Sequence, residues 1–297
     1  MKFFLALFAI LAIAGEMRSS GVSKPLVIAH RGARSLAPEN TLAAARTAKR
    51  LGADGWEFDV RMSKDGELIL MHDETLSRTT NASELFPNQA PWSVAEFTLA
   101  EIKTLDAGSW FVESDPYGTI ASGDVPAPEA ESFRGERVPT LREALALSRE
   151  LGLWVNIELK SRPSFVLAPS TKLLVEKTVE LVRAMGMTSK VLISSFDPAA
   201  VQYVNAVAPE IPAALLVSSL PPDPLGYLRA LGAEALNPRY DLVTEGLLNI
   251  LSQAGFKVFI WTVNELEDLR KFAVDPRIAG IITDWPQRLL ALLGRAK

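Results

Sequence analysis

The chain contains no cysteine among its 297 residues. This absence excludes disulfide bonds, zinc–thiolate sites and a cysteine nucleophile, and it excludes a lipid anchor on a cysteine at a signal-cleavage site. Histidine is almost as rare, because only His30 and His72 are present. Any chemistry that needs an imidazole must therefore use these two side chains.

A strong net charge is missing as well. The formal net charge is −4 and the isoelectric point is about 5.5. Nucleic-acid-binding domains usually carry a basic patch, so we expect no nucleic-acid partner. Apolar residues make up 48% of the chain, which is enough for a sizeable hydrophobic core.

The longest apolar run, FFLALFAILAIA, lies near the N-terminus and follows Lys2. It is shorter than the about 20 residues that a membrane-spanning helix needs. The run ends in Ala12-Ile13-Ala14, a small-x-small pattern that is typical of a cleavage site. We therefore expect residues 1–20 to be a signal peptide that directs export to the periplasm or the exterior. An uncleaved membrane anchor is the alternative, and we expect no stable membrane span after cleavage.

Extended apolar segments then alternate with amphipathic segments of helical spacing. The predicted strands are 25–30, 55–60, 154–159, 191–196, 211–217, 234–237, 257–263 and 280–283. The predicted helices are 41–51, 141–151, 172–185, 199–207, 224–231, 244–254, 265–272 and 286–293. Eight such units predict an α/β fold, a closed (β/α)8 TIM barrel over residues 24–297. An open doubly wound sheet is the alternative, but no G-x-G-x-x-G fingerprint favours it.

One stretch breaks this alternation. Asp65-Gly66 is a turn signal, so we expect residues 67–71 to pair with the second strand as a hairpin. Residues from about 74 to 137 contain no clear βα unit, apart from short helical pieces such as 94–105. A connection this long inside a barrel is usually functional. We expect a small capping insertion after the second strand, over the C-terminal rim of the barrel.

The second strand carries two carboxylates in an otherwise apolar run. Strand residues two apart share a face, so Glu57 and Asp59 lie on one side and Trp56, Phe58 and Val60 on the other. Two like charges side by side in a buried strand are costly unless a cation lies between them. We expect a divalent cation there. Ion pairs with Arg or Lys in the barrel core are the alternative.

Other polar residues fall at predicted strand ends, where barrels place catalytic groups. Glu158, near the end of the third strand, supplies a third acid. Glu57, Asp59 and Glu158 together offer hard oxygen ligands, which suit Ca²⁺ or Mg²⁺ better than Zn²⁺. We therefore predict one divalent cation, Ca²⁺ or Mg²⁺, as cofactor.

The remaining candidates are histidines and cations at the same strand ends. His30 and His72 are natural general acids and bases, because imidazole titrates near neutral pH. Arg31 and Lys160 could bind a phosphate, as a planar fork and as a point charge, or could pair with the acids instead. Together these residue types predict a phosphoester site, where two imidazoles move protons on either side of an in-line displacement. They do not specify the ester.

The motifs resemble the glycerophosphodiester phosphodiesterase family. They span nearly all of the chain after residue 28: AHRGARSLAPENT at 29–41, GWEFDVRMSKDGELILMHDETLSRTT at 55–80, LDAGSWF at 105–111, RVPTLREAL at 137–145, NIELK at 156–160, SSFD at 194–197, WTVN at 261–264 and ITDWP at 282–286. The resemblance implies a TIM barrel with a small capping insertion, a divalent metal, and hydrolysis of glycerophosphodiesters to an alcohol and glycerol phosphate. The partner is then a small-molecule phosphodiester.

The resemblance also implies a role for individual residues. His30 and His72 match the acid–base pair, and Trp261 matches a residue that lines the substrate pocket. Glu57, Asp59 and Glu158 match the metal ligands, and Arg31 and Lys160 match the phosphate contacts. From the residues alone, Asn40 suits a helix N-cap, and Glu39 and Asn40 together are expected to brace the first loop.

Two other functions remain open. A lysophospholipase D-like hydrolase of single-chain phospholipids would need an apolar channel for an acyl tail. The insertion contains apolar residues that could line such a channel or form the insertion's own core: Leu85, Phe86, Trp92, Phe97, Trp110 and Phe111. A non-catalytic exported ligand-binding protein on the same scaffold is the second. The sequence does not predict the oligomeric state.

Overall fold

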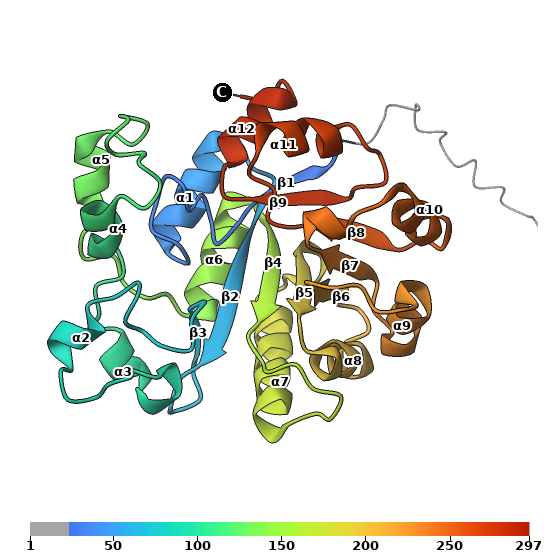
Figure 1. The fold of residues 1–297 in the computed structure, drawn as a ribbon. Helices are drawn as coiled ribbons and strands as arrows, with labels where there is room; N and C mark the ends of the chain where they lie inside the picture. Colours follow the sequence, from blue (N-terminus) through green and yellow to red (C-terminus); the bar gives the residue numbers. More distant parts are fainter. Residues whose placement is uncertain (1–23, 297) are drawn as a thin grey trace, which may run out of the picture.

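The computed structural model of the protein describes residues 24–296, in which strands and helices alternate as the sequence predicts (Figure 1). The signal peptide predicted at residues 1–20 lies outside the described residues and stays a prediction. Among residues 24–296, no helix combines the length and the apolarity that crossing a membrane requires.

Eight parallel strands form the barrel wall. They are β1 (Leu26–Ala29), β2 (Gly55–Met62), β4 (Trp154–Leu159), β5 (Val191–Ser195), β6 (Ala213–Val217), β7 (Ala235–Pro238), β8 (Lys257–Ile260) and β9 (Gly280–Thr283). Neighbouring strands pair in the order β1-β2-β4-β5-β6-β7-β8-β9, and β1 also pairs with β9. The sheet is therefore closed, which confirms the (β/α)8 barrel and excludes the open doubly wound sheet.

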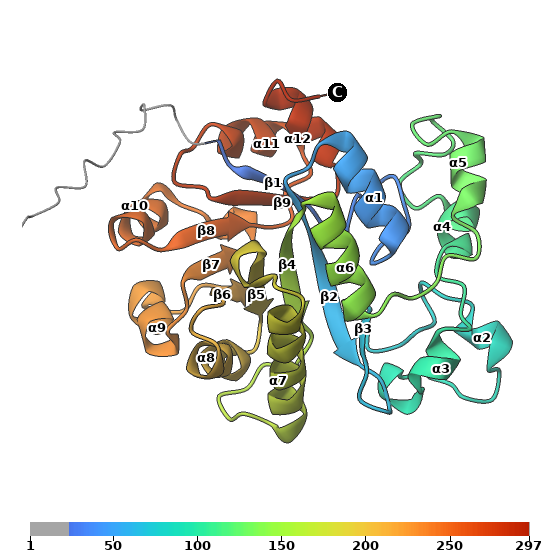
Figure 2. The same ribbon diagram turned by 180° about the vertical axis from the view of Figure 1, so that it is seen from behind.

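A helix follows each barrel strand and packs on the outside of the barrel (Figures 1 and 2). The helices are α1 (Leu42–Leu51), α6 (Leu141–Leu151), α7 (Pro169–Ala184), α8 (Pro198–Val207), α9 (Pro224–Leu231), α10 (Glu245–Gln253), α11 (Leu266–Ala273) and α12 (Pro286–Leu292). Short 3₁₀ turns precede β5 and α10, at η2 (Thr188–Lys190) and η3 (Tyr240–Leu242). Every predicted helix forms, with ends within three residues of those expected.

The long strand β2 carries the hairpin that the sequence predicts. β3 (Leu68–Leu70) pairs antiparallel with the last residues of β2, from Val60↔Leu70 to Met62↔Leu68. The turn requires glycine at Gly66, because its φ of +80° lies in the left-handed region. The hairpin extends β2 beyond the barrel rim and delivers His72, two residues after β3, to the C-terminal end of the barrel.

Side chains on the two faces of the barrel strands enter different cores. Trp56 and Phe58 of β2 point outward into the layer between the strands and the helices, and Trp56 Nε1 donates a 2.8 Å hydrogen bond to Ser148 Oγ of α6. Inside the barrel, a second cluster gathers Ile28, Leu192, Ala214, Ala235, Phe259 and Ile282. This interior packing makes the barrel a filled core, as expected of the fold, and not a pore.

The insertion between β3 and α6 lies beside the barrel, next to β3 and α1 (Figures 1 and 2). Its helices are short: α2 (Ala82–Leu85), η1 (Val94–Glu96), α3 (Leu99–Ile102), α4 (Ser109–Ser114) and α5 (Ala127–Ser132). Phe86, Trp92 and Phe97 pack in one small core with β3, and Trp110 and Phe111 pack in another with α1. Five of the six apolar candidates for an acyl channel are thus used for internal packing, and Leu85 is exposed. A role of the insertion as a cap over the site stays a prediction.

Candidate active site

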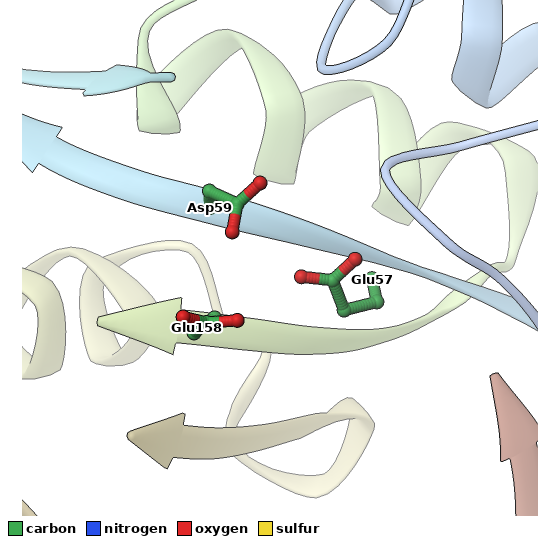
Figure 3. A group of neighbouring side chains, drawn as sticks. All are labelled: Glu57, Asp59 and Glu158. Atoms are coloured by element: carbon green, nitrogen blue, oxygen red, sulfur yellow. The ribbon is translucent and has the colours of Figure 1, made fainter. Parts of the chain in front are cut away.

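Three carboxylates meet inside the C-terminal end of the barrel. Glu57 and Asp59 project inward from β2, and the β2–β4 register sets Asp59 directly opposite Glu158. One carboxylate oxygen from each side chain lies within 4.8 Å of those of the other two (Figure 3). The predicted convergence of the three acids from neighbouring strands is confirmed.

Burial and charge act differently on the three acids. Burial raises the pKa of Glu57 well above its usual value, and the nearby charges of Asp59 and Glu158 raise it further. Burial also raises the pKa of Glu158. Burial alone would raise the pKa of Asp59 too, but the cations of Lys160 and Arg31 outweigh it and lower that pKa. The three carboxylates of the cluster therefore outnumber the two cations, Lys160 and Arg31, that lie against them.

A divalent cation fits this cluster. Glu57 Oε2 accepts a 2.8 Å hydrogen bond from the backbone N–H of Arg31, but Glu57 Oε1 is buried and has no hydrogen-bond partner among the described residues. An unpaired buried carboxylate oxygen is costly. All three side chains offer oxygen ligands, which are those that Ca²⁺ and Mg²⁺ take in proteins. Glu57, Asp59 and Glu158 could therefore hold such an ion.

The two predicted phosphate contacts lie against the same acids. Lys160 Nζ is 2.5 Å from Glu158 Oε1 and 3.1 Å from Asp59 Oδ1. Arg31 Nε is 3.4 Å from Asp59 Oδ2, and its Nη1 donates to Glu39 Oε1. The alternative that these cations pair with the acids is thus the arrangement in the structure. Their contact with phosphate stays a prediction.

His30 follows β1 and is oriented by an aspartate from the other end of the chain. His30 Nδ1 is 2.6 Å from Asp284 Oδ1, and Asp284 Oδ2 accepts a hydrogen bond from Asn264 Nδ2. With Nδ1 on Asp284, the opposite nitrogen Nε2 lies 3.9 Å from Glu57 Oε2. Burial lowers the pKa of His30, against the opposing charge of Asp284. The ring is therefore oriented by Asp284 with Nε2 on the side of the acids.

His72 has a similar partner, but a local one. His72 Nδ1 is 2.7 Å from Oδ1 of its neighbour Asp73, whose Oδ2 accepts a 2.6 Å hydrogen bond from Arg78 Nε. Arg61 donates two hydrogen bonds to the His72 carbonyl oxygen and fixes the backbone there. Burial is also the largest effect on His72, and it lowers the pKa of the ring.

Both histidines line one cavity of about 230 Å³. Seven of the eight predicted site residues line it, and Asp59 lies beneath the surface with 1% of its area exposed. Trp261 lines the apolar side together with Phe196 and Leu216. A hydrogen bond from Trp261 Nε1 to the carbonyl oxygen of Asn237 and an edge-on contact with Phe196 fix its indole. The cavity thus has a charged side and an apolar side.

The loop between β1 and α1 supports the site in ways that the sequence did not indicate. Thr41 is the N-cap of α1, so the prediction for Asn40 is wrong. Asn40 adopts a φ of +57°, donates to Asp59 Oδ2 at 2.8 Å and accepts from the Asp59 N–H, so it orients the carboxylate. Gly32 lets this loop lie against α1, because a Cβ there would be 2.4 Å from the Cβ of Ala44.

Glu39 braces this loop, as predicted, by receiving three arginines. Arg31, Arg34 and Arg78 all lie within 3.1 Å of its carboxylate oxygens. Burial alone would raise the pKa of Glu39, but these cations lower it to about 2. Glu39 therefore stays ionised and connects the loop after β1 to the start of the insertion.

Sequence reasoning missed the supporting roles of Asp284, Asn264 and Asp73. All three follow predicted strand ends, and ITDWP, WTVN and HD appear among the motifs quoted above. Their position just after a predicted strand was therefore the signal in the sequence that could have identified these three residues. Nothing in their spacing indicated that Asp284 faces His30.

The chain matches the glycerophosphoryl diester phosphodiesterase family over residues 30–288. The chain belongs to this family. It is 37% identical over 270 residues to a glycerophosphodiester phosphodiesterase of Caldanaerobacter subterraneus, with 91% of this chain and 98% of that protein covered. A glycerophosphodiester phosphodiesterase of Bacillus subtilis is 31% identical, with 88% and 84% covered.

Solved structures of the family resemble this fold. A phosphodiesterase of Oleispira antarctica, in complex with the product sn-glycerol-3-phosphate, has a TM-score of 0.75 and 28% identity, with 91% of this chain and 97% of that chain covered. A glycerophosphodiester phosphodiesterase of Agrobacterium tumefaciens has a TM-score of 0.69 and 29% identity, with 90% and 99% covered. The barrel and the family membership thus rest on independent comparisons.

Proposed function

We propose that the protein is a metal-dependent glycerophosphodiester phosphodiesterase, which hydrolyses glycerophosphodiesters to an alcohol and glycerol phosphate. Its family membership supports the reaction. The observation that carries the mechanism is one cavity that brings together three converging carboxylates and two histidines, each paired with an aspartate. His30 and His72 are the acid–base pair in this proposal.

The phosphate is held at the charged side of the cavity by Arg31 and Lys160. Both line the cavity, and both lie within 3.4 Å of the Asp59 carboxylate, which keeps them in position. The glycerol part then lies toward Trp261 on the apolar side. This orientation sets the phosphorus between the two imidazoles, as an in-line displacement requires.

Each histidine can exchange a proton through its Nε2. The Nδ1 atoms face Asp284 and Asp73, and these carboxylates stabilise the imidazolium that forms when Nε2 takes a proton. One imidazole accepts a proton from the attacking water as its oxygen bonds to phosphorus. The other delivers a proton to the alcohol oxygen as the bond between that oxygen and phosphorus breaks. The protein's own groups thus balance the proton transfers.

Glu57, Asp59 and Glu158 would hold one divalent cation, Ca²⁺ or Mg²⁺. Bound there, the ion would act as a Lewis acid that polarises a phosphoryl oxygen. The unpaired Oε1 of Glu57 and the all-oxygen donor set support this assignment.

Release of glycerol phosphate from glycerophosphocholine tests the proposal. Exhaustive chelation should abolish activity, and added Ca²⁺ or Mg²⁺ should restore it. The ion that restores more activity at the same concentration is the preferred one. The matched control is Glu234→Gln, an acid outside the cavity, which should leave the metal response unchanged, whereas Glu158→Gln should raise the metal concentration required. Full activity after chelation would remove the metal from the mechanism.

A further inference from the structure

A second hollow adjoins the catalytic cavity on the side of Lys160. It holds about 450 Å³ against about 230 Å³ for the cavity, and Lys160 lines both. A smaller hollow between them shares Glu158, Lys160 and Phe196 with the cavity. The same hollow shares Arg61, Glu74 and Arg162 with the larger one. The three hollows therefore adjoin one another in a row, which we call the path, and we call the larger hollow the side groove.

The size of the catalytic cavity makes this path relevant to the substrate. Pockets that enclose a small organic ligand usually hold about 300–1,000 Å³, so the cavity alone is small for a complete diester. A phosphodiester carries one substituent on either side of phosphorus. With the phosphate at Arg31 and Lys160, one substituent lies against Trp261 and the other passes Lys160 into the side groove.

The walls of the side groove come from two facing segments, and the start of α7 with Ser170, Thr171 and Leu174 also lines it. One wall belongs to the end of β2 and the start of the insertion, with Arg61, Glu74 and Ala95. The facing wall is the loop after β4, with Ser161, Arg162 and Ser164. Glu74 and Arg162 approach each other from the two walls, with 3.6 Å between Arg162 Nη2 and Glu74 Oε2. The groove is therefore bounded by two guanidinium groups, the Lys160 ammonium, one carboxylate and several hydroxyls, with apolar surface from residues such as Met62 and Leu174 between them.

This chemistry selects between classes of alcohol. No aromatic side chain of the described residues lines the side groove, so it has no aromatic cage of the kind that recognises quaternary ammonium groups. Three cations, Arg61, Lys160 and Arg162, against the one carboxylate of Glu74 also make the groove cationic on balance. Arginine, glutamate and serine together offer both donors and acceptors to hydroxyl groups. An alcohol with several hydroxyls satisfies these groups better than choline does.

We propose that the side groove binds the alcohol part of the diester and favours polyhydroxylated alcohols, such as glycerol or inositol, over choline. This inference rests on the proposed function, because it assumes that a glycerophosphodiester occupies the cavity. Arg162 and Glu74 then determine specificity, and they take no part in proton transfer.

The test compares kcat/KM for glycerophosphoglycerol, glycerophosphoinositol, glycerophosphocholine and the methyl diester of glycerol phosphate, in the presence of the divalent cation. The wild-type protein should favour the two polyol diesters over the choline diester by roughly fivefold or more. Arg162→Ala should lower kcat/KM for the polyol diesters by roughly five- to twentyfold, through KM. The methyl group of the methyl diester does not reach the groove. In Arg162→Ala, kcat/KM for this substrate should therefore change less than about twofold.

Ala95→Trp is a second variant, which fills the side groove from an exposed position and spares the charged groups. It should slow glycerophosphoinositol most and the methyl diester least. The matched control is Arg183→Ala, which breaks an exposed pair with Glu210 away from the groove and should leave all four substrates unchanged. Melting temperatures of all variants verify that they are folded.

The outcomes separate the two proposals. Equal turnover of choline and polyol diesters by the wild-type protein overturns the side-groove assignment and leaves the proposed function standing. Equal losses on all four substrates in Arg162→Ala and Ala95→Trp also overturn it. If the wild-type protein hydrolyses none of the four, the proposed function fails, and the inference fails with it.

Discussion

The two histidines are both held by an aspartate, but the two regions are built differently. His30 pairs with Asp284, which lies 254 residues away in the sequence, and 15% of its side chain is exposed. His72 pairs with its sequence neighbour Asp73, and 33% of its side chain is exposed. One pair is completed by barrel closure and is mostly buried, whereas the other is local and stands at the edge of the insertion.

This difference determines how replaceable each aspartate is. Water and solvent screening can substitute for part of an interaction at an exposed pair, but not at a buried one. Asp284 is itself held by Asn264 and lies 3.7 Å from Arg34 Nε, so its orientation is fixed from several elements. Asp73 depends chiefly on Arg78. We therefore expect the His30 region to be the less tolerant of substitution.

Glu39 links the two regions. It receives Arg34, which approaches Asp284, and Arg78, which binds Asp73. The ion pairs Asp284–Arg34–Glu39–Arg78–Asp73 pass through two residues of the loop after β1, and Arg31 is a third partner of Glu39. A substitution at Glu39 should consequently affect both histidine regions, mostly through stability.

The largest effect is expected from removing the imidazoles themselves. His30→Ala and His72→Ala should each lower kcat by roughly 10²- to 10⁴-fold, which is the usual contribution of a general acid or base. If the two act in one reaction, the double variant should be little worse than the worse single variant. Steady-state kinetics on glycerophosphocholine measure this. Multiplicative losses would mean that the histidines act independently.

The aspartates come next, and they test the comparison directly. Asp284→Asn should lower kcat by roughly a hundredfold, because a buried imidazolium loses its only carboxylate partner at Nδ1. Asp73→Asn should cost only about tenfold, because solvent reaches His72. Both values come from kcat at saturating substrate. Equal losses would show that burial does not distinguish the two regions.

Glu39→Gln should destabilise the protein more than it slows catalysis. The pKa of Glu39 falls from its usual 4.5 to about 2 in the folded state, which corresponds to about 3 kcal/mol of stability at neutral pH. Because the folded-state pKa is the lower one, this stability is present above about pH 4.5 and is lost as the pH falls toward 2. The variant should melt roughly 5–10 °C lower at pH 7.

The wild-type protein should also lose stability between pH 5 and 3 more steeply than Glu39→Gln does. Thermal melts over this range measure both effects. Parallel melting curves for the two proteins would contradict the assignment of Glu39 as an ionised link. The conservative substitution to Asp, which keeps the charge, is the matched control.

The smallest effect is expected for Arg78→Ala. Arg78 contacts both Asp73 and Glu39, but 41% of its side chain is exposed, so solvent replaces much of its interaction. We expect kcat to fall less than about fivefold and the melting temperature to fall less than for Glu39→Gln. If kcat fell as far as in Asp73→Asn, His72 would depend on the contacts of Arg78 with Asp73 and Glu39 as well as on Asp73 itself.

Much of the site could be predicted from the sequence, because its ligands lie on regular strands. Residues two apart in β2 must share a face, and parallel neighbours bring their C-terminal ends together. These two rules predicted that Glu57, Asp59 and Glu158 would meet. The turn at Asp65-Gly66 similarly predicted the hairpin that carries His72.

The tertiary structure alone decided the contacts of side chains that lie outside regular strands and helices. Arg31 and Asn40 both have positive φ, at +53° and +57°, so no strand or helix period predicts where their side chains point. The incorrect N-cap prediction for Asn40 has this cause, since the residue turns away from the helix toward Asp59. The three-arginine cluster on Glu39 likewise joins segments whose spacing in the sequence carries no periodic signal.

The sequence by itself thus determined the alternation of strands and helices and the shared face of the acids on β2, since periodicity along a strand or helix is a local property that backbone geometry enforces. Only the closed barrel decided that Asp284 orients His30, because β9 becomes the neighbour of β1 through folding of the whole chain. Packing of the insertion against β3 and α1, beside the barrel, was decided in the same way. The apolar side chains of the insertion specify that it forms a hydrophobic core. The surfaces of the barrel that are free for packing decide where that core lies.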